Sequence, residues 1–171
     1  MKSVLFFLIP MLAFAAPAQV VLISHAEKQD DVLSLKGKER AMALVPFFNG
    51  NPKVLSHGFP TIVYSAPTTD TMQTVKPLAE NMKIAVVNKF SDSKKVVSEI
   101  LTNPDYEGKM VVICWSQKEM PQIASLLGAK KTPKKWSEEA HDRLWVLNFD
   151  EEGKVSFKDL PQKLLYGDSP K

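Results

Sequence analysis

Short apolar runs alternate along this chain with longer segments that have the apolar spacing of a helix. Three runs rich in β-branched residues predict strands, at 20–23, 61–64 and 110–115. The segments of helical period are 36–48, 69–82 and 91–101. Because the predicted strands are apolar throughout, helices should cover both of their faces. We therefore expect a three-layer α/β/α fold with a largely parallel central sheet.

The C-terminal third predicts a further helix and a pair of strands. Pro121 suits the first turn of a helix over 121–127, which Gly128 would end. Residues 143–150 and 154–160 should form a closing hairpin. The lysine-rich loop 130–139 and the tail from Gly167 are predicted to be solvated. With 171 residues the chain is long enough for one domain with a core and too short for two ordinary ones, and it shows no internal repeat, so we expect one domain over 19–171.

The first 18 residues have the pattern of a secretory signal peptide. Lys2 precedes an apolar stretch of about a dozen residues, and Ala16-Pro17-Ala18 ends it with small residues. The stretch contains Pro10 and is shorter than the ~20 residues that a membrane span needs. The alternative is an uncleaved N-terminal anchor. Cleavage after Ala18 predicts a periplasmic or secreted protein that keeps no membrane span.

Composition narrows the classes of partner. The formal charge of +3 falls to +2 without Lys2, and the lysines are spread without interleaved aromatic residues, so nucleic acid is not indicated. Cys114, the only cysteine, lies in an apolar run and is expected to be a small buried side chain. The partner is predicted to be an unidentified small molecule or protein.

Polar residues follow each of the three predicted strands directly. Ser24-His25 follow the first, the turn 65–70 follows the second, and Ser116-Gln117 follow the third. Because functional groups of an open parallel sheet gather at the carboxyl ends of its strands, we expect these residues to meet at one edge.

Several stretches resemble the histidine phosphatase superfamily, also called phosphoglycerate mutase-like, in order and spacing. They are LISHAEK, LSLKGKERAMAL, VYSAPTTDTMQTVKPLA, VVICWSQKEMPQIASLLGA and DRLWVLNFDEEGKV, of which the 33–41 and 73–79 elements are the most specific. The resemblance implies phosphoryl transfer onto the histidine of an Arg-His-Gly or Arg-His-Ala motif and then to water. It also implies a second arginine after the second strand and a second histidine after a later one.

This chain departs from that pattern at most of these positions. The nucleophile is present as His25. Ser24 and Asp70 stand where the resemblance places the two arginines, and Ser116 where it places the second histidine. A carboxylate in place of an arginine at ~4 Å could weaken phosphate binding by up to about 8 kcal/mol at an effective dielectric of 20.

Few other cations are available to hold a phosphate. The chain has two arginines, Arg40 in the first predicted helix and Arg143 at the start of a late strand, and neither is an obvious substitute. Lys28 and Lys118 are weak candidates for positive charge, and Trp115 is expected to pack beside the pocket. We therefore predict an exported histidine phosphatase-like protein that is catalytically impaired: a pseudophosphatase or binding module.

Two alternatives stay open. The first is an active phosphomonoesterase that uses His25, with lysines in place of the arginines. The second is a hydrolase of another type, since Ser116, His25 and Asp70 have the residue types of a nucleophile, a base and an orienting acid. A His25–Asp70 metal site falls short of the three or four ligands such sites use, so neither metal nor cofactor is expected.

Other polar residues have structural interpretations. Glu27 and Lys28 are expected to be a solvated pair or turn-formers. His57 and His141 are expected at the surface or in capping roles, and Trp136 and Trp145 are expected to be structural.

Overall fold

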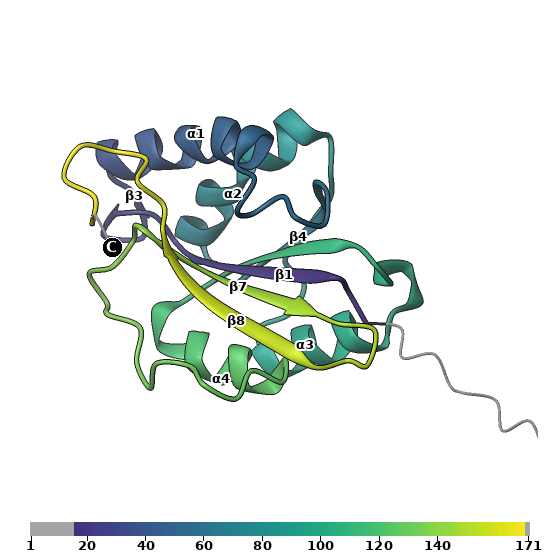
Figure 1. The fold of residues 1–171 in the computed structure, drawn as a ribbon. Helices are drawn as coiled ribbons and strands as arrows, with labels where there is room; N and C mark the ends of the chain where they lie inside the picture. The colour runs from purple at the N-terminus through teal and green to yellow at the C-terminus, as the bar shows by residue number, and fades with distance from the viewer. Residues whose placement is uncertain (1–15, 170–171) are drawn as a thin grey trace, which may run out of the picture.

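The computed structural model describes residues 16–169, in which one sheet lies between two layers of helices (Figure 1). The strands have the order β5-β4-β6-β1-β7-β8. Their bounds are β1 (Gln19–Ser24), β4 (Pro60–Ser65), β5 (Val86–Val87), β6 (Met110–Trp115), β7 (Arg143–Phe149) and β8 (Val155–Pro161). β5, β4, β6 and β1 are parallel, whereas β7 and β8 run antiparallel at one side. The predicted three-layer class with a largely parallel sheet is confirmed.

The helices form close to where the sequence pattern places them. They are α1 (Leu35–Gly50), α2 (Thr69–Met82), α3 (Ser93–Thr102) and α4 (Met120–Leu126), with short 3-10 turns η1 (Pro104–Tyr106) and η2 (Gln117–Glu119). A two-stranded ribbon, β2 (Lys28–Gln29) and β3 (Val32–Leu33), precedes α1. The helix predicted at residue 91 begins at Ser93, because the Asp92 side chain caps it by accepting from the Lys94 N–H.

Both faces of the sheet are buried, which explains the continuous apolar strands. In β1, Val20 and Leu22 belong to the core beneath α3 and α4, whereas Val21 and Ile23 belong to the core beneath α1 and α2. Figure 1 shows the two helix pairs on opposite sides of the sheet. Each residue of β1 is buried, as period-two alternation between two cores requires.

The C-terminal hairpin forms as predicted, and its place in the sheet matters for the site. β7 lies antiparallel beside β1, pairing Leu144 with Ile23, so the residues just before β7 reach the carboxyl end of β1. The lysines of the loop 130–139 are exposed, as expected, but Trp136 is buried against Trp145, with ring centroids 4.7 Å apart.

The expectation of a solvated tail is wrong. The Asp168 side chain is only 3% exposed, because it pairs with the buried Arg40. The tail therefore belongs to the folded unit.

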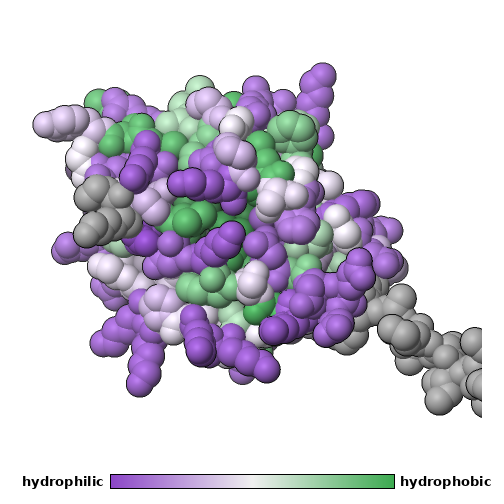
Figure 2. Space-filling view, in the orientation of Figure 1, coloured by the Kyte–Doolittle hydropathy of each residue, from purple (hydrophilic) through white to green (hydrophobic). Residues whose placement is uncertain are grey.

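Polar side chains cover most of the face that Figure 2 shows, with apolar patches between them. No helix within residues 16–169 is long and apolar enough to cross a membrane. The predicted signal peptide falls mainly on residues 1–15, which lie outside the described residues, so it remains a prediction.

Candidate functional site

The carboxyl ends of β1 and β6 border a pocket of about 490 Å³. Ser24 pairs with Trp115 in the parallel ladder, so the residues that follow the two strands emerge side by side. The lining residues are His25, Glu27, Lys28, Ser116, Gln117, Lys118, Glu138 and His141. Four of the candidates singled out from sequence, His25, Lys28, Ser116 and Lys118, thus line one pocket.

Three other candidates are buried and are not among the residues that line this pocket. Ser24 is 2% exposed, and its hydroxyl donates to the Ala140 carbonyl at 3.4 Å. Asp70 and Trp115 are buried as well. A longer side chain at position 24 would have to displace the segment around Ala140.

The hydrogen bonding of His25 defines which of its ring nitrogens is available. Its Nδ1 lies 2.9 Å from the Ala26 carbonyl oxygen, which can only accept, so Nδ1 carries a hydrogen. In the neutral ring, Nε2 then holds the lone pair. That nitrogen is chemically competent as a nucleophile or base.

Asp70, at the start of α2, sits beside this imidazole. Its Oδ2 lies 3.8 Å from His25 Nδ1 and 3.1 Å from Lys28 Nζ. Burial alone would raise the pKa of Asp70, but hydrogen bonds from Thr68, Lys28 and the Thr71 N–H outweigh it and hold the pKa below its ordinary value. The carboxylate is therefore charged and largely neutralises Lys28, leaving little of that lysine's charge for a phosphate.

Ser116 is engaged by Glu119 rather than by His25. Its hydroxyl donates to Glu119 Oε2 at 3.2 Å, and the Trp115 indole donates to the same oxygen at 2.6 Å. No hydrogen bond joins Ser116 to His25 within residues 16–169. Trp115 is buried at the end of β6, and its indole helps to fix Glu119.

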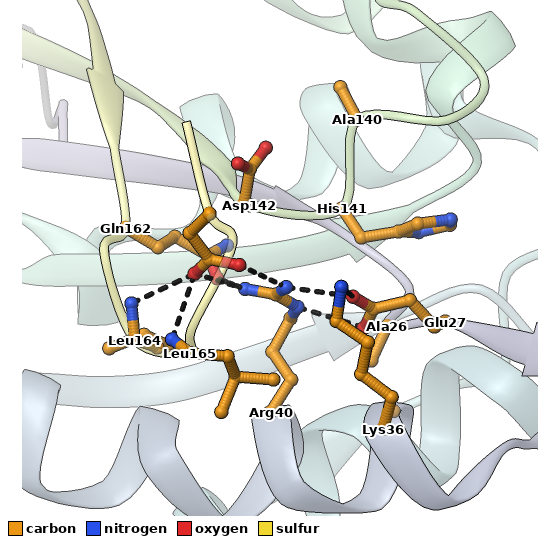
Figure 3. A network of polar contacts seen from close by, with 12 residues as sticks. Ala26, Glu27, Lys36, Arg40, Ala140, His141, Asp142, Gln162, Leu164 and Leu165 are labelled. Carbon is orange, nitrogen blue, oxygen red and sulfur yellow. Dashed lines mark hydrogen bonds and ion pairs between the residues drawn. The ribbon is translucent and has the colours of Figure 1, made fainter. Parts of the chain in front are cut away.

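A charged network forms one side of the site (Figure 3). The Arg40 guanidinium donates to both carboxylate oxygens of Glu27, at 2.7 and 2.9 Å, and to both of Asp168, at 2.7 and 2.9 Å. Lys36 adds a contact to Glu27 at 3.3 Å. Of the two roles expected for Glu27 and Lys28, the solvated pair is wrong, because the buried Arg40 offers Glu27 a two-pronged partner in a less hydrated place.

The close approach of α1 makes this network possible. A Cβ built at Gly37 would lie 1.9 Å from the Glu27 carbonyl oxygen, so only glycine fits there. The Ser34 N–H and hydroxyl donate to the same carbonyl, at 3.0 and 3.1 Å. The 33–41 element therefore fixes the backbone that follows His25.

Neither arginine of the chain faces the pocket as a free cation. Arg40 is committed to Glu27 and Asp168, and Arg143 lies 2.6 Å from Asp159. The lining itself contains two lysines and two glutamates, so its fixed charges cancel. Within the described part of the chain, no three His, Cys, Asp or Glu side chains meet in a way that could hold a metal ion.

A second histidine, His141, lines the pocket. The sequence predicts a surface or capping role for this residue. The His141 ring centroid lies 5.3 Å from that of His25, and its Nδ1 lies 2.9 Å from the His25 carbonyl oxygen. His141 comes from the segment before β7, not from the end of β6. Only the antiparallel pairing of β7 with β1 places it there, and no local sequence signal specifies that pairing.

The same architecture occurs in solved structures of phosphatases. SixA from Agrobacterium tumefaciens superimposes with a TM-score of 0.61 at 16% identity, over 84% of this chain and 98% of that one. A protein histidine phosphatase SixA in complex with tungstate superimposes with a TM-score of 0.58 at 17% identity, over 84% of this chain and 97% of that one. Mycobacterial glucosyl-3-phosphoglycerate phosphatase with inorganic phosphate superimposes with a TM-score of 0.58 at 12% identity, over 84% of this chain and 95% of that one. No protein-family model matches the sequence, and comparison with curated proteins gave no match.

These neighbours define the fold. The chain has the histidine phosphatase-like, or phosphoglycerate mutase-like, fold, as the resemblance in its sequence implied. At these identities the likeness establishes architecture alone.

Proposed function

We propose that this is an exported histidine phosphatase-like protein that is catalytically impaired and binds a small polar ligand in the pocket beside His25. One observation carries the proposal: both arginines of the chain are bound by carboxylates, Arg40 by Glu27 and Asp168, and Arg143 by Asp159. Phosphoryl transfer depends mainly on positioned positive charge, so a pocket without a free arginine lacks its principal stabilising group.

The charge around His25 supports the same conclusion. Asp70 stands where the resemblance calls for an arginine, and it neutralises Lys28 at 3.1 Å. Lys118 remains, but a lysine is a point charge and does not supply the planar, two-pronged grip of a guanidinium.

The test compares the purified mature chain, residues 19–171, with its His25→Ala variant on generic phosphomonoesters. We expect equal, background-level hydrolysis. Hydrolysis by the parent well above the variant, with phosphate trapped on His25, would overturn the proposal.

Residual phosphatase activity is the second candidate, and the lone pair on His25 Nε2 favours it. In that reaction Nε2 attacks phosphorus, the bond to the leaving oxygen breaks, that oxygen takes a proton, and water later hydrolyses the phosphohistidine. The trapping experiment decides between the two candidates. A serine hydrolase receives less support, because the Ser116 hydroxyl donates to Glu119.

A further inference from the structure

The two pocket histidines share one hydrogen-bonding arrangement. Nδ1 of each lies 2.9 Å from a backbone carbonyl oxygen, that of Ala26 for His25 and that of His25 for His141. Because a carbonyl oxygen only accepts, both Nδ1 atoms carry hydrogen. The Gln117 amide nitrogen lies 3.3 Å from His141 Nδ1, but both of these nitrogens carry hydrogen. The amide donates to the Glu138 carbonyl oxygen, at 3.2 Å.

This arrangement links the charge of the pocket to protons. In the neutral rings both Nε2 atoms are acceptors and repel an anion. Protonation turns an Nε2 into a donor and adds a positive charge beside the pocket that both residues line. We infer that the His25–His141 pair is a proton-linked binding site for a small oxyanion, in which binding the anion takes up a proton. The inference rests on the proposed function of a ligand-binding pocket.

The other charged groups near the two histidines are balanced by groups of opposite sign, so they do not supply the positive charge that this proton would add. Asp70 from α2 lies 3.8 Å from His25 Nδ1 and is paired with Lys28 of β2. Glu27 is paired with Arg40 and Lys36 of α1. Lys118 and Glu138 complete the charged lining and have opposite signs. With these charges balanced, a proton taken up on an imidazole ring would add a positive charge that the rest of the lining does not supply.

The direction of the pH dependence follows. Burial lowers the pKa of His141 below its usual value of 6.5. The hydrogen bond to the His25 carbonyl would raise this pKa, but the effect of burial is larger. The His141 ring is therefore neutral at pH 7.5 and gains its charge only at lower pH. Oxyanion affinity should rise as the pH falls.

Calorimetry with inorganic sulfate tests the inference, because the charge of sulfate is constant across this range. The mature protein should bind sulfate at least about tenfold more tightly at pH 5.5 than at pH 7.5, since each proton taken up contributes up to tenfold per pH unit. Titrations in buffers of different ionisation enthalpy should show proton uptake on binding.

Two variants make the test specific. His141→Gln, which keeps an N–H donor for the His25 carbonyl, should lose most of the pH dependence. His57→Gln, which changes an exposed histidine, should behave like the parent. Circular dichroism at both pH values shows whether each variant is folded, and a proton-resonance titration of the His141 ring in the parent, shifted by sulfate, gives a readout independent of any variant.

The outcomes separate the inference from the proposed function. No sulfate binding, pH-independent binding, or an unchanged pH dependence in folded His141→Gln overturns the inference. If phosphomonoesters are hydrolysed while sulfate binding remains proton-linked, the proposed function fails and the inference stands.

Discussion

Asp168 and Arg40, 128 residues apart in sequence, form a two-pronged ion pair with N···O distances of 2.7 and 2.9 Å. Arg40 makes a second two-pronged pair with Glu27, which lines the pocket. The end of the chain is therefore connected through one buried guanidinium to the residue two positions after His25. The backbone N–H groups of Leu164 and Leu165 donate to the same Asp168 carboxylate, so the tail closes around it.

Asp168→Asn should lower the free energy of unfolding by about 3 kcal/mol, because it removes one partner of a buried ion pair and leaves the Arg40 charge less compensated. Urea unfolding measures the change. Asp159→Asn is the matched control, since it breaks the more exposed pair with Arg143 and should cost about 1 kcal/mol or less. Equal losses in the two variants would show that the tail contributes no more than a surface contact.

Acid should weaken the fold through the same network. Burial alone would raise the pKa of Glu27, but its hydrogen bonds with Arg40 outweigh this and lower the pKa from 4.5 to about 2; Asp168 is lowered to about 2 for the same reason. Because these pKa values are depressed in the folded state, their stabilisation is full above about pH 4.5 and is lost as the pH falls toward 2. Denaturant midpoints across this range should fall steeply for the parent. A Glu27→Gln/Asp168→Asn variant with an equally steep fall would contradict this account.

Gly37→Ala should be strongly destabilising, by about 3 kcal/mol or more, because the new Cβ would overlap the Glu27 carbonyl oxygen and α1 would have to move away from it. Gly50→Ala is the control within the same helix. A Cβ there meets nothing within 4 Å, so the substitution should be neutral or slightly stabilising. Thermal unfolding of the two variants tests the contrast, and a similar Tm for both would be inconsistent with a close backbone contact at Gly37.

Asp70→Asn should strengthen oxyanion binding. The substitution removes the carboxylate that neutralises Lys28 and that lies 3.8 Å from His25 Nδ1. A unit charge at ~4 Å is worth up to about 4 kcal/mol at an effective dielectric of 20, so even a quarter of this predicts a roughly fivefold gain. Sulfate titration at pH 5.5 measures it. Glu80→Gln, which removes an exposed charge paired with Lys76, should leave the affinity unchanged.

The mature protein should begin at Gln19 or close to it. Lys2, the apolar stretch and Ala16-Pro17-Ala18 motivate this expectation. N-terminal sequencing of protein recovered from the cell envelope checks it. An intact Met1 in the cytoplasmic fraction would be incompatible with export.

Local pattern was enough to predict the sheet edge that carries His25 and Ser116, because each residue directly follows an apolar strand. It could not reveal His141, whose place depends on which strand β7 pairs with. Nor could it reveal the role of Arg40: a helical arginine is usually solvated, and its partner Asp168 lies near the far end of the sequence. Both omissions concern contacts between distant segments, for which hydrophobic periodicity contains no information.

The place of β1 in the sheet has a consequence for how the protein is made. Its two neighbours are β6, which begins at Met110, and β7, which begins at Arg143. A ribosome-bound chain that has emerged only as far as α2 therefore has a strongly apolar first strand without its partners. Folding should wait until most of the polypeptide has been synthesised, as expected when non-local pairing dominates. Such a delay would keep the nascent chain unfolded for longer, which is compatible with the export proposed above.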